Sequence, residues 1–456
     1  MIVLLIIWLF LFRVKYGVYM LYAIGTSILY LGKIKFDTIT GLDIAGLSIT
    51  VLLLYGMLLS KKNIVYEIRK EGLFKFNIYL LVPLFLSGVL LTGFLYPSHT
   101  YSNFISRTGS WVKLLNCCLF LIIVSAFFNN RQSINKLINI MLISLIIPGF
   151  IFVWQLSVGE LVANVRTGYN VPDALFHHPA VYAYALVYHF PLIVFKFFQS
   201  QKFKQKFFWI IVGSVILSLI YFTYRRGVWL GLLVQLIVYF VFLKQSRIKI
   251  ICGYFLLIVT FILLFFTELP VTISDRFNDI ALFFHNFTEA FSTHNYDDLF
   301  SGRWAFFRAN LLYIFKQPIL NLFIGNGIGA THYASEQMGV TGGDHNTYLM
   351  LIIDYGLINF IAFMIFLFCV IYQLFKISSS EDPFLQEFSI MLLSLFSSYL
   401  VMGMVIHTLY AQSTNWLLWG LIGAILSCRY RKDEKEKKHQ KVQVRLPSGI
   451  PDFEKG

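Results

Sequence analysis

Charged side chains are scarce in this chain. Only 13% of its 456 residues are Asp, Glu, Lys or Arg, whereas 58% are hydrophobic and 18% are aromatic. A soluble globular domain carries roughly 25% charged residues, and a disordered chain is poor in large apolar side chains. The composition therefore excludes both classes and predicts an integral membrane protein that crosses the bilayer many times.

Cysteine is also rare, and its placement excludes two further classes. The five cysteines lie in or at the ends of apolar segments, without the spacing of metal ligands; they are Cys117, Cys118, Cys252, Cys369 and Cys428. Thiols in such surroundings behave as small buried hydrophobic groups. We therefore predict neither a disulfide framework nor a metal site.

The apolar runs predict an all-α, polytopic membrane protein with about 12 transmembrane helices. About 20 apolar residues are needed to cross the hydrocarbon as a helix. Residues 1–12 are apolar but short, and they could form a thirteenth span, half of a bent first span or an interfacial helix. The predicted spans are 17–32, 42–60, 76–96, 112–128, 137–157, 180–198, 207–223, 228–243, 249–267, 347–375, 387–405 and 410–428.

Positive charge exceeds negative charge, with a formal net charge of +14. The basic residues lie between apolar runs and in the tail, not in a stripe on a soluble domain, so nucleic acid is not an expected partner. If the tail is cytoplasmic, 26 of the 37 Lys and Arg residues lie on that side. This bias satisfies the positive-inside rule. The bilayer is the expected partner, and segment 33–35, with two lysines, is the weak point because it falls outside.

One predicted outer segment, 268–346, is far longer than the others. Loops of such length are usually functional or disordered. Its aromatic and apolar residues from Trp304 to Phe315 recur at helical spacing, so we expect short helices on the outer membrane face. The predicted organisation is an N-terminal bundle over 1–267, the large loop over 268–346, C-terminal transmembrane helices over 347–428 and a basic cytoplasmic tail over 429–456.

A few polar residues stand out against this apolar background. Arg225 and Arg226 separate two predicted spans almost without a loop, at the outer edge of the hydrocarbon. A charge at that depth is costly unless it is paired or functional. The two arginines either snorkel to the surface or bind a phosphate-bearing lipid head group, which the planar guanidinium can hold bidentately. Arg166, in another outer loop, could border the same site.

A second group of polar residues belongs to the large loop. Arg303 and Arg308 lie on its expected helix, and they are either ordinary surface arginines or part of a site. His345 and Asn346 follow two glycines where the chain re-enters the membrane, and histidine can act as a base near neutral pH. The run from Gly325 to Gly329 is predicted to be a tight turn and not a nucleotide loop.

The order of these motifs resembles the O-antigen ligase and polymerase superfamily of bacterial envelope glycosyltransferases. The resemblance rests on TYRRGVWLGLLVQLIVYF, then SGRWAFFRANLLYIFKQPILNLFIGNGIG, then DHNTYLMLIIDYGLINF. It covers roughly residues 220–375. The family pattern has an arginine at a span start, a loop arginine on a helix before a Pro and a Gly-x-Gly turn, and a His-Asn at the next span.

The resemblance implies roles for particular residues. The essential arginines fall on Arg226 and Arg303, and the essential histidine falls on His345. Arg225 occupies a position where many members have serine, and we expect it to bind substrate together with Asn346, Arg308 and Arg166. Such enzymes are expected to need neither a metal nor a nucleotide cofactor.

The expected activity is inverting polymerisation of undecaprenyl-diphosphate-linked repeat units into O-antigen or capsular polysaccharide, at the outer face of the bacterial cytoplasmic membrane. The donor is the lipid-linked glycan, the acceptor is another glycan, and a chain-length regulator or flippase is an expected partner. One alternative is an O-antigen ligase that transfers the glycan to lipid A–core. An alternative of another class is a transporter, for which twelve spans is a common count but the chain lacks the expected internal repeat.

Overall fold

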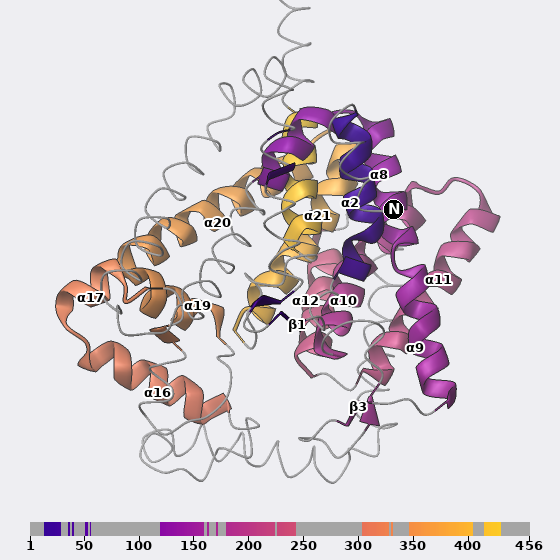
Figure 1. Cartoon of the computed structure of the whole chain (residues 1–456). Coiled ribbons are helices and arrows are strands. Elements are labelled where there is room, and N and C mark those ends of the chain that lie inside the picture. The colour runs from indigo at the N-terminus through magenta and orange to yellow at the C-terminus, as the bar shows by residue number, and fades with distance from the viewer. Residues whose placement is uncertain are drawn as a thin grey trace, which may run out of the picture.

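The computed structural model describes the chain as helical (Figure 1). The described residues are 13–28, 35–36, 39–40, 51–52, 55, 119–158, 162–163, 170–171, 179–223, 226–242, 303–327, 330–331, 346–404 and 415–429. Within them the expected all-α character is confirmed. The exceptions are two short antiparallel pairs, β1 (Lys35–Phe36) with β2 (Ile39–Thr40) and β3 (Val162–Ala163) with β4 (Asn170–Val171).

Four of the described helical stretches are long and apolar enough to cross a membrane: Arg131–Val158, Phe203–Phe222, Thr347–Ser378 and Pro383–Met402. Together with shorter apolar helices they cover many of the predicted spans, while spans 76–96 and 249–267 and residues 1–12 lie outside the described part. The total of 12 or 13 spans therefore stays a prediction. The helices are α2 (Val14–Ile28), α8 (Arg131–Ile143), α9 (Ile146–Val158), α10 (Pro179–Gln199), α11 (Phe203–Phe222), α12 (Arg226–Phe242), α16 (Arg303–Lys316), α17 (Ile319–Ile324), α19 (Thr347–Met350), η4 (Leu351–Tyr355), α20 (Gly356–Ser378) and α21 (Pro383–Met402), with further helices at 119–127 and 415–429.

A hydrogen bond from α12 to α10 satisfies a backbone carbonyl that a proline in α10 leaves without a donor. Pro191 lies inside α10 and has no N–H, so the carbonyl of Val187, four residues earlier, loses its helical donor. The buried side chain of Gln235 on α12 donates to that carbonyl at 3.0 Å. The Tyr239 hydroxyl donates to the carbonyl of Pro191 at 3.1 Å. This pairing fixes α10 and α12 side by side and parallel, and it explains a glutamine within an apolar helix, where an unsatisfied carbonyl would cost several kcal/mol.

Helix α12 also packs closely along α21. The Ser394 hydroxyl donates to the carbonyl of Gln235 at 3.3 Å. A Cβ on Gly231 would meet the side chains of Ser398 and Met402, so only glycine lets the two helices approach this closely. Because Gln235 pairs with Ser394 and the earlier Gly231 with later residues of α21, the two helices are antiparallel.

This pairing defines two ends of the bundle. The Gly403 end holds the start of α12 at Arg226 and the residue that follows α21, Gly403. The Gln199 end holds the last residue of α10, Gln199, and the first two turns of α21, where the Gln199 amide donates to Glu387. At about 1.5 Å per residue, the 20 residues of α21 separate the two ends by roughly 30 Å.

One predicted span boundary was wrong, and one predicted span is interrupted. The helix predicted at 137–157 begins at Arg131, because the Asn130 side chain accepts from the Ser133 N–H at 2.9 Å and caps it, and it is divided at Ser144 and Leu145 into α8 and α9. The helix predicted at 347–375 is interrupted by η4 and by Gly356, whose φ is +84°. The other predicted boundaries that fall within the described helices agree within a few residues.

The expectation of short helices in the large loop is confirmed. Helix α16 spans Arg303–Lys316, and α17 follows it after Pro318, which ends the first helix and precedes the second. Helix α16 contacts α19 and η4, and α17 contacts η4 and α20. In Figure 1, α16, α17 and α19 lie on the same flank of the molecule. The predicted domain boundaries themselves stay predictions.

Candidate functional site

Arg226 is the first residue of α12. The antiparallel register with α21 places its backbone at the Gly403 end of the bundle. Helix α21 ends there, and α19 begins there. One of the two predicted essential arginines therefore begins a helix at that end.

The start of α19 is fixed to the same end of α21. The Thr347 N–H donates to the carbonyl of Gly403 at 2.8 Å, and the Tyr348 hydroxyl donates to the carbonyl of Leu400 at 2.7 Å. Asn346 is the N-cap, because its Oδ1 accepts from the N–H groups of Tyr348 and Leu349 at 2.9 and 3.0 Å. An asparagine in this position satisfies donors that a helix start leaves unpaired. Asn346 thus has a structural role that the sequence prediction did not assign to it.

Arg303 is the first residue of α16, and α16 contacts both α19 and η4. The buried residues Phe306, Ala309 and Asn310 form one face of this helix. Arg308, which was predicted to bind substrate, is half-buried. Its Nη1 atom is buried and has no hydrogen-bond partner within the described part of the chain. Leaving a guanidinium nitrogen unpaired in this way is costly, so it is a donor that a bound anion could satisfy.

The predicted tight turn at Gly325 is confirmed, and it packs directly on the interrupted helix. Gly325 and Gly327 both have φ of +90°, and Gly356 has φ of +84°. A Cβ on Gly325 would lie 2.5 Å from the carbonyl oxygen of Asp354 and 2.5 Å from the carbonyl carbon of Tyr355. A Cβ on Gly356 would in turn meet the backbone of residues 323–325. Glycine is required on both sides because two backbones cross there without room for a side chain.

The turn also satisfies the carbonyl groups that the helix interruption leaves without helical donors. The Asn326 N–H donates to Ile353 O at 2.9 Å, and the Gly327 N–H donates to Asp354 O at 2.9 Å. The Asn359 amide donates to Tyr355 O at 2.7 Å. Non-helical backbone at membrane depth is tolerated where protein groups pair it in this way.

Two buried polar side chains hold the turn from within. Asn326 donates to Gln317 at 2.6 Å and accepts from Asn321 at 2.8 Å. The carboxylate of Asp354 accepts from the N–H of Thr331 at 2.9 Å and from its hydroxyl. Asp354 is therefore a buried packing group whose carboxylate is satisfied by hydrogen bonds. The sequence prediction missed that the turn and Asp354 belong to one assembly, although the glycines at 325, 327 and 356 were the available signal.

The structure thus brings together the starts of α12 and α19 at the end of α21, with α16 contacting α19. At Arg226 and Arg303 it describes the backbone. The predicted site residues Arg166, Arg225 and His345 lie outside the described residues, although His345 directly precedes the Asn346 cap in the sequence. Among the residues that the structure describes, no group of three or more His, Cys, Asp or Glu side chains could hold a metal ion.

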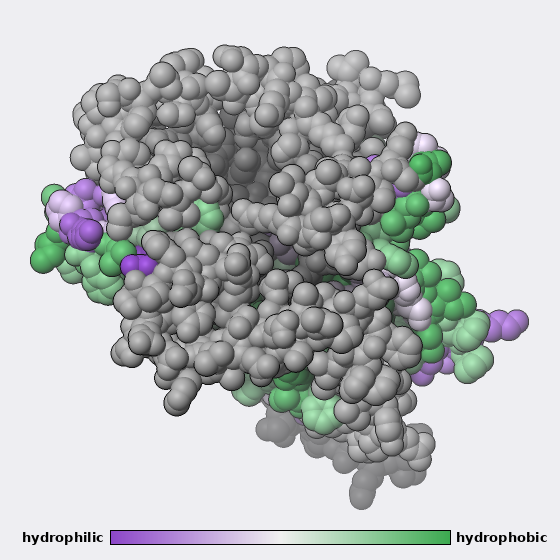
Figure 2. Space-filling model, turned by 90° about the horizontal axis from the view of Figure 1, so that it is seen from below, coloured by the Kyte–Doolittle hydropathy of each residue, from purple (hydrophilic) through white to green (hydrophobic). Residues whose placement is uncertain are grey.

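These features define a helical integral membrane protein. Large apolar side chains gather at the periphery of the described part, where Figure 2 shows hydrophobic residues on both flanks. Residues 210–364 match the O-Antigen ligase family, a segment that runs from within α11 to within α20. The resemblance to the O-antigen ligase and polymerase superfamily is confirmed over this segment. It indicates a membrane enzyme with lipid-linked glycan substrates and fits a location in the inner membrane.

The matched segment contains six of the seven predicted site residues: Arg225, Arg226, Arg303, Arg308, His345 and Asn346. Arg166 lies before it. Among curated proteins, no sequence matches the chain.

Proposed function

We propose that the protein is an inverting glycosyltransferase that polymerises undecaprenyl-diphosphate-linked repeat units into O-antigen or capsular polysaccharide. The catalytic residues are Arg226, Arg303 and His345, with the active site on the outer face of the cytoplasmic membrane. Arg225, Arg308, Asn346 and Arg166 contact the substrate. The donor is the lipid-linked glycan and the acceptor is the glycan of another repeat unit.

The observation that carries the proposal is the convergence of helix starts at the Gly403 end. Arg226 begins α12 there. Thr347, which follows His345 by two residues in the sequence, donates its N–H to Gly403 O at the same end. Arg303 begins α16, which contacts the same α19. The starts of α12 and α19, which are 121 residues apart in the sequence, therefore lie at one end of α21, and α16 contacts one of these two helices.

Helix starts suit this chemistry. The unpaired N–H groups and the helix dipole at a helix N-terminus favour negative charge. In the proposed reaction the acceptor oxygen bonds to the anomeric carbon while the bond from that carbon to the lipid diphosphate oxygen breaks. The departing diphosphate gains negative charge, which the guanidiniums of Arg226 and Arg303 stabilise. The acceptor hydroxyl gives its proton to His345, and attack opposite the leaving group inverts the anomeric configuration.

Arg308 adds a donor to this region. Its buried Nη1 atom has no partner among the described residues, and it lies on α16 five residues after Arg303. A phosphate or sugar oxygen would satisfy that donor. Asn346 uses its amide oxygen as a cap, so its amide nitrogen is the group that would meet the substrate.

The test is polymer formation in cells that carry Arg226→Ala, Arg303→Ala or His345→Ala at the protein level of the wild type. We expect each variant to lose the ladder of long chains. Lys316→Ala is the matched control, because Lys316 is the exposed last residue of the same helix that begins at Arg303. Wild-type ladders in the three site variants would refute the proposal. Solute uptake by reconstituted protein that is unaffected by them would favour a transporter.

A ligase is the second candidate, because the family that residues 210–364 match is described as O-Antigen ligase. Both reactions use the same class of donor, and the products of a deletion strain distinguish them. Single repeat units on the lipid A–core indicate that a polymerase is missing. Long glycan that remains on undecaprenyl diphosphate indicates that a ligase is missing.

A further inference from the structure

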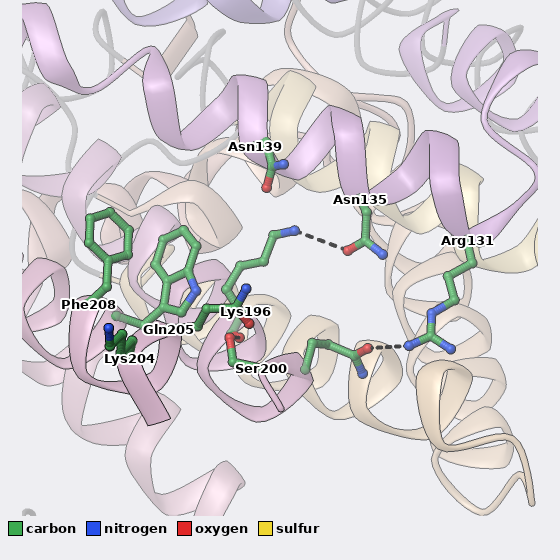
Figure 3. Close-up of a pocket in the computed structure, with 10 residues that line it drawn as sticks. Arg131, Asn135, Asn139, Lys196, Ser200, Lys204, Gln205 and Phe208 are labelled. Atoms are coloured by element: carbon green, nitrogen blue, oxygen red, sulfur yellow. Dashed lines mark hydrogen bonds between the residues drawn. The ribbon is translucent and has the colours of Figure 1, made fainter. Parts of the chain in front are cut away.

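A cationic pocket lies at the Gln199 end of the bundle, between α8, α10 and α11. Its volume is about 490 Å³, and Figure 3 shows the side chains of Asn135, Asn139 and Lys196 converging on one space. The bundle places it at the far end from Arg226 and Gly403, so it is distinct from the proposed catalytic region. The lining residues are Arg131, Asn135, Asn139, Lys196, Gln199, Ser200, Lys204, Gln205, Phe208 and Trp209.

Two of the cationic side chains are held in place by neighbours. The Lys196 ammonium donates to Asn135 Oδ1 at 3.1 Å (Figure 3). Arg131 donates to Gln199 Oε1 at 2.8 Å and lies over the ring of Phe384, with 5.1 Å from the guanidinium carbon to the ring centroid. An ammonium has three donor hydrogens, so the bond to Asn135 leaves donor capacity for a ligand. Positions fixed in advance lower the entropic cost of binding.

The pocket carries a strong excess of positive charge. Arg131, Lys196 and Lys204 line it, and no Asp or Glu is among its lining residues. Glu387, which does not line the pocket, accepts from Gln199 and interacts with Arg131, so it offsets part of the charge of that arginine. Lys196 and Lys204 therefore supply most of the uncompensated charge. Amide and hydroxyl groups around them add neutral hydrogen-bond donors of the kind that phosphate oxygens accept.

An apolar surface adjoins the polar pocket. Phe208 and Trp209 line one side, and the outer face of α11 exposes 80% of Phe203 and 54% of Phe207. Helix α11 is long and apolar enough to cross the membrane, and only 17% of its most apolar 18-residue stretch is buried. A ligand that combines a phosphate with long hydrocarbon chains matches both surfaces. Basic pockets between transmembrane helices are known to hold anionic lipid head groups.

We propose that this pocket binds the phosphate group of an anionic phospholipid, with its acyl chains lying along the exposed apolar face of α11. Lys196 and Lys204 are the principal phosphate contacts, and Arg131 borders the site. In the orientation expected from the basic residues, the pocket faces the cytoplasmic leaflet. A bound lipid would connect α8, α10 and α11 at that end.

Native mass spectrometry of the full-length protein in detergent tests this site, with dioleoylphosphatidylglycerol and dioleoylphosphatidylcholine as probes. We expect tighter binding of phosphatidylglycerol, and a weakening of about fivefold for each of Lys196→Gln and Lys204→Gln. Lys202→Gln is the matched control. Lys202 is exposed, lies two residues from Lys204 and is not part of the lining. Its replacement is expected to leave the affinity within a factor of about two, because an exposed charge outside the site is screened.

Three outcomes would overturn the proposal. The first is equal affinity for the two lipids, and the second is an equal loss in Lys202→Gln and Lys204→Gln. The third is stabilisation by inorganic phosphate that depends on Lys196 and Lys204 without any preference for phosphatidylglycerol, which would assign the pocket to a soluble phosphate. Melting temperatures without added lipid confirm that each variant is folded. If Lys196→Gln lowers that temperature, Lys204→Gln carries the test, because Lys204 is exposed on α11.

Discussion

Gly325→Ala tests the backbone crossing beside the candidate site. The added Cβ would lie 2.5 Å from Asp354 O and 2.5 Å from the carbonyl carbon of Tyr355, far inside contact distance. Both are backbone atoms of the interrupted helix, so no side chain can move aside. Alanine would also have to adopt a φ of +90°. The substitution therefore combines conformational strain with overpacking.

The expected magnitude follows from these two costs. A left-handed conformation costs a non-glycine residue about 1–2 kcal/mol, and overpacking a well-packed site costs typically about 1–3 kcal/mol. Together they predict a loss of roughly 2–5 kcal/mol of stability. For a chain of this length we expect the melting temperature of the detergent-solubilised protein to fall by about 2–5 °C, because each kcal/mol shifts it by about one degree. Transfer activity should fall as well, because the turn holds η4 and therefore α19.

Gly213→Ala is the matched control for this experiment. Gly213 lies within α11, and its added Cβ would meet only Ile193 Cγ2 at 3.7 Å, an ordinary contact. Alanine favours a helix over glycine by about 1 kcal/mol, so this variant should melt at or above the temperature of the wild type. If Gly325→Ala melts within one degree of Gly213→Ala, the crossing does not have the geometry described and the reasoning is wrong.

Three further predictions concern single contacts. Gly231→Val should separate α12 from α21 and lower the melting temperature. Met402→Ala in the same chain should restore part of the loss, because Met402 is one of the side chains that a Cβ on residue 231 would meet. A double variant no more stable than Gly231→Val would contradict this packing. Asp354→Ala should cost about 1–3 kcal/mol by leaving the Thr331 donors unpaired, whereas Asp354→Asn keeps an acceptor and should cost less; equal melting temperatures for the two variants would contradict the role of Asp354 as an acceptor. Asn346→Ala should lower the stability by about 0.5–2 kcal/mol through loss of the helix cap, whereas Asn346→Ser should keep the cap and the melting temperature. A polymer ladder shorter than that of the wild type in Asn346→Ser supports contact with the substrate, and a normal ladder refutes it.

The helical architecture and many of its boundaries could be predicted because apolar length and turn residues act locally. The run from 383 to 402 is apolar enough to span the membrane, and Asp382 and Pro383 mark its start. The Gly325 turn was predictable for the same reason. Asn130 shows the limit of this approach, because its capping bond starts α8 at Arg131 within a polar stretch that hydropathy assigns to a loop.

Distant contacts determined what the sequence left open. The motif order by itself indicated the superfamily and predicted the functional arginines and histidine, since those residues are read one position at a time. Only the tertiary structure shows that the turn at Gly325 repairs the helix interruption at Gly356, that Arg226 begins its helix at the same end of α21 as Thr347, and that Lys196 and Lys204 share a pocket at the other end. Each of these pairings joins segments that a hydropathy profile scores separately. The packing of helices against one another brings these segments together in space.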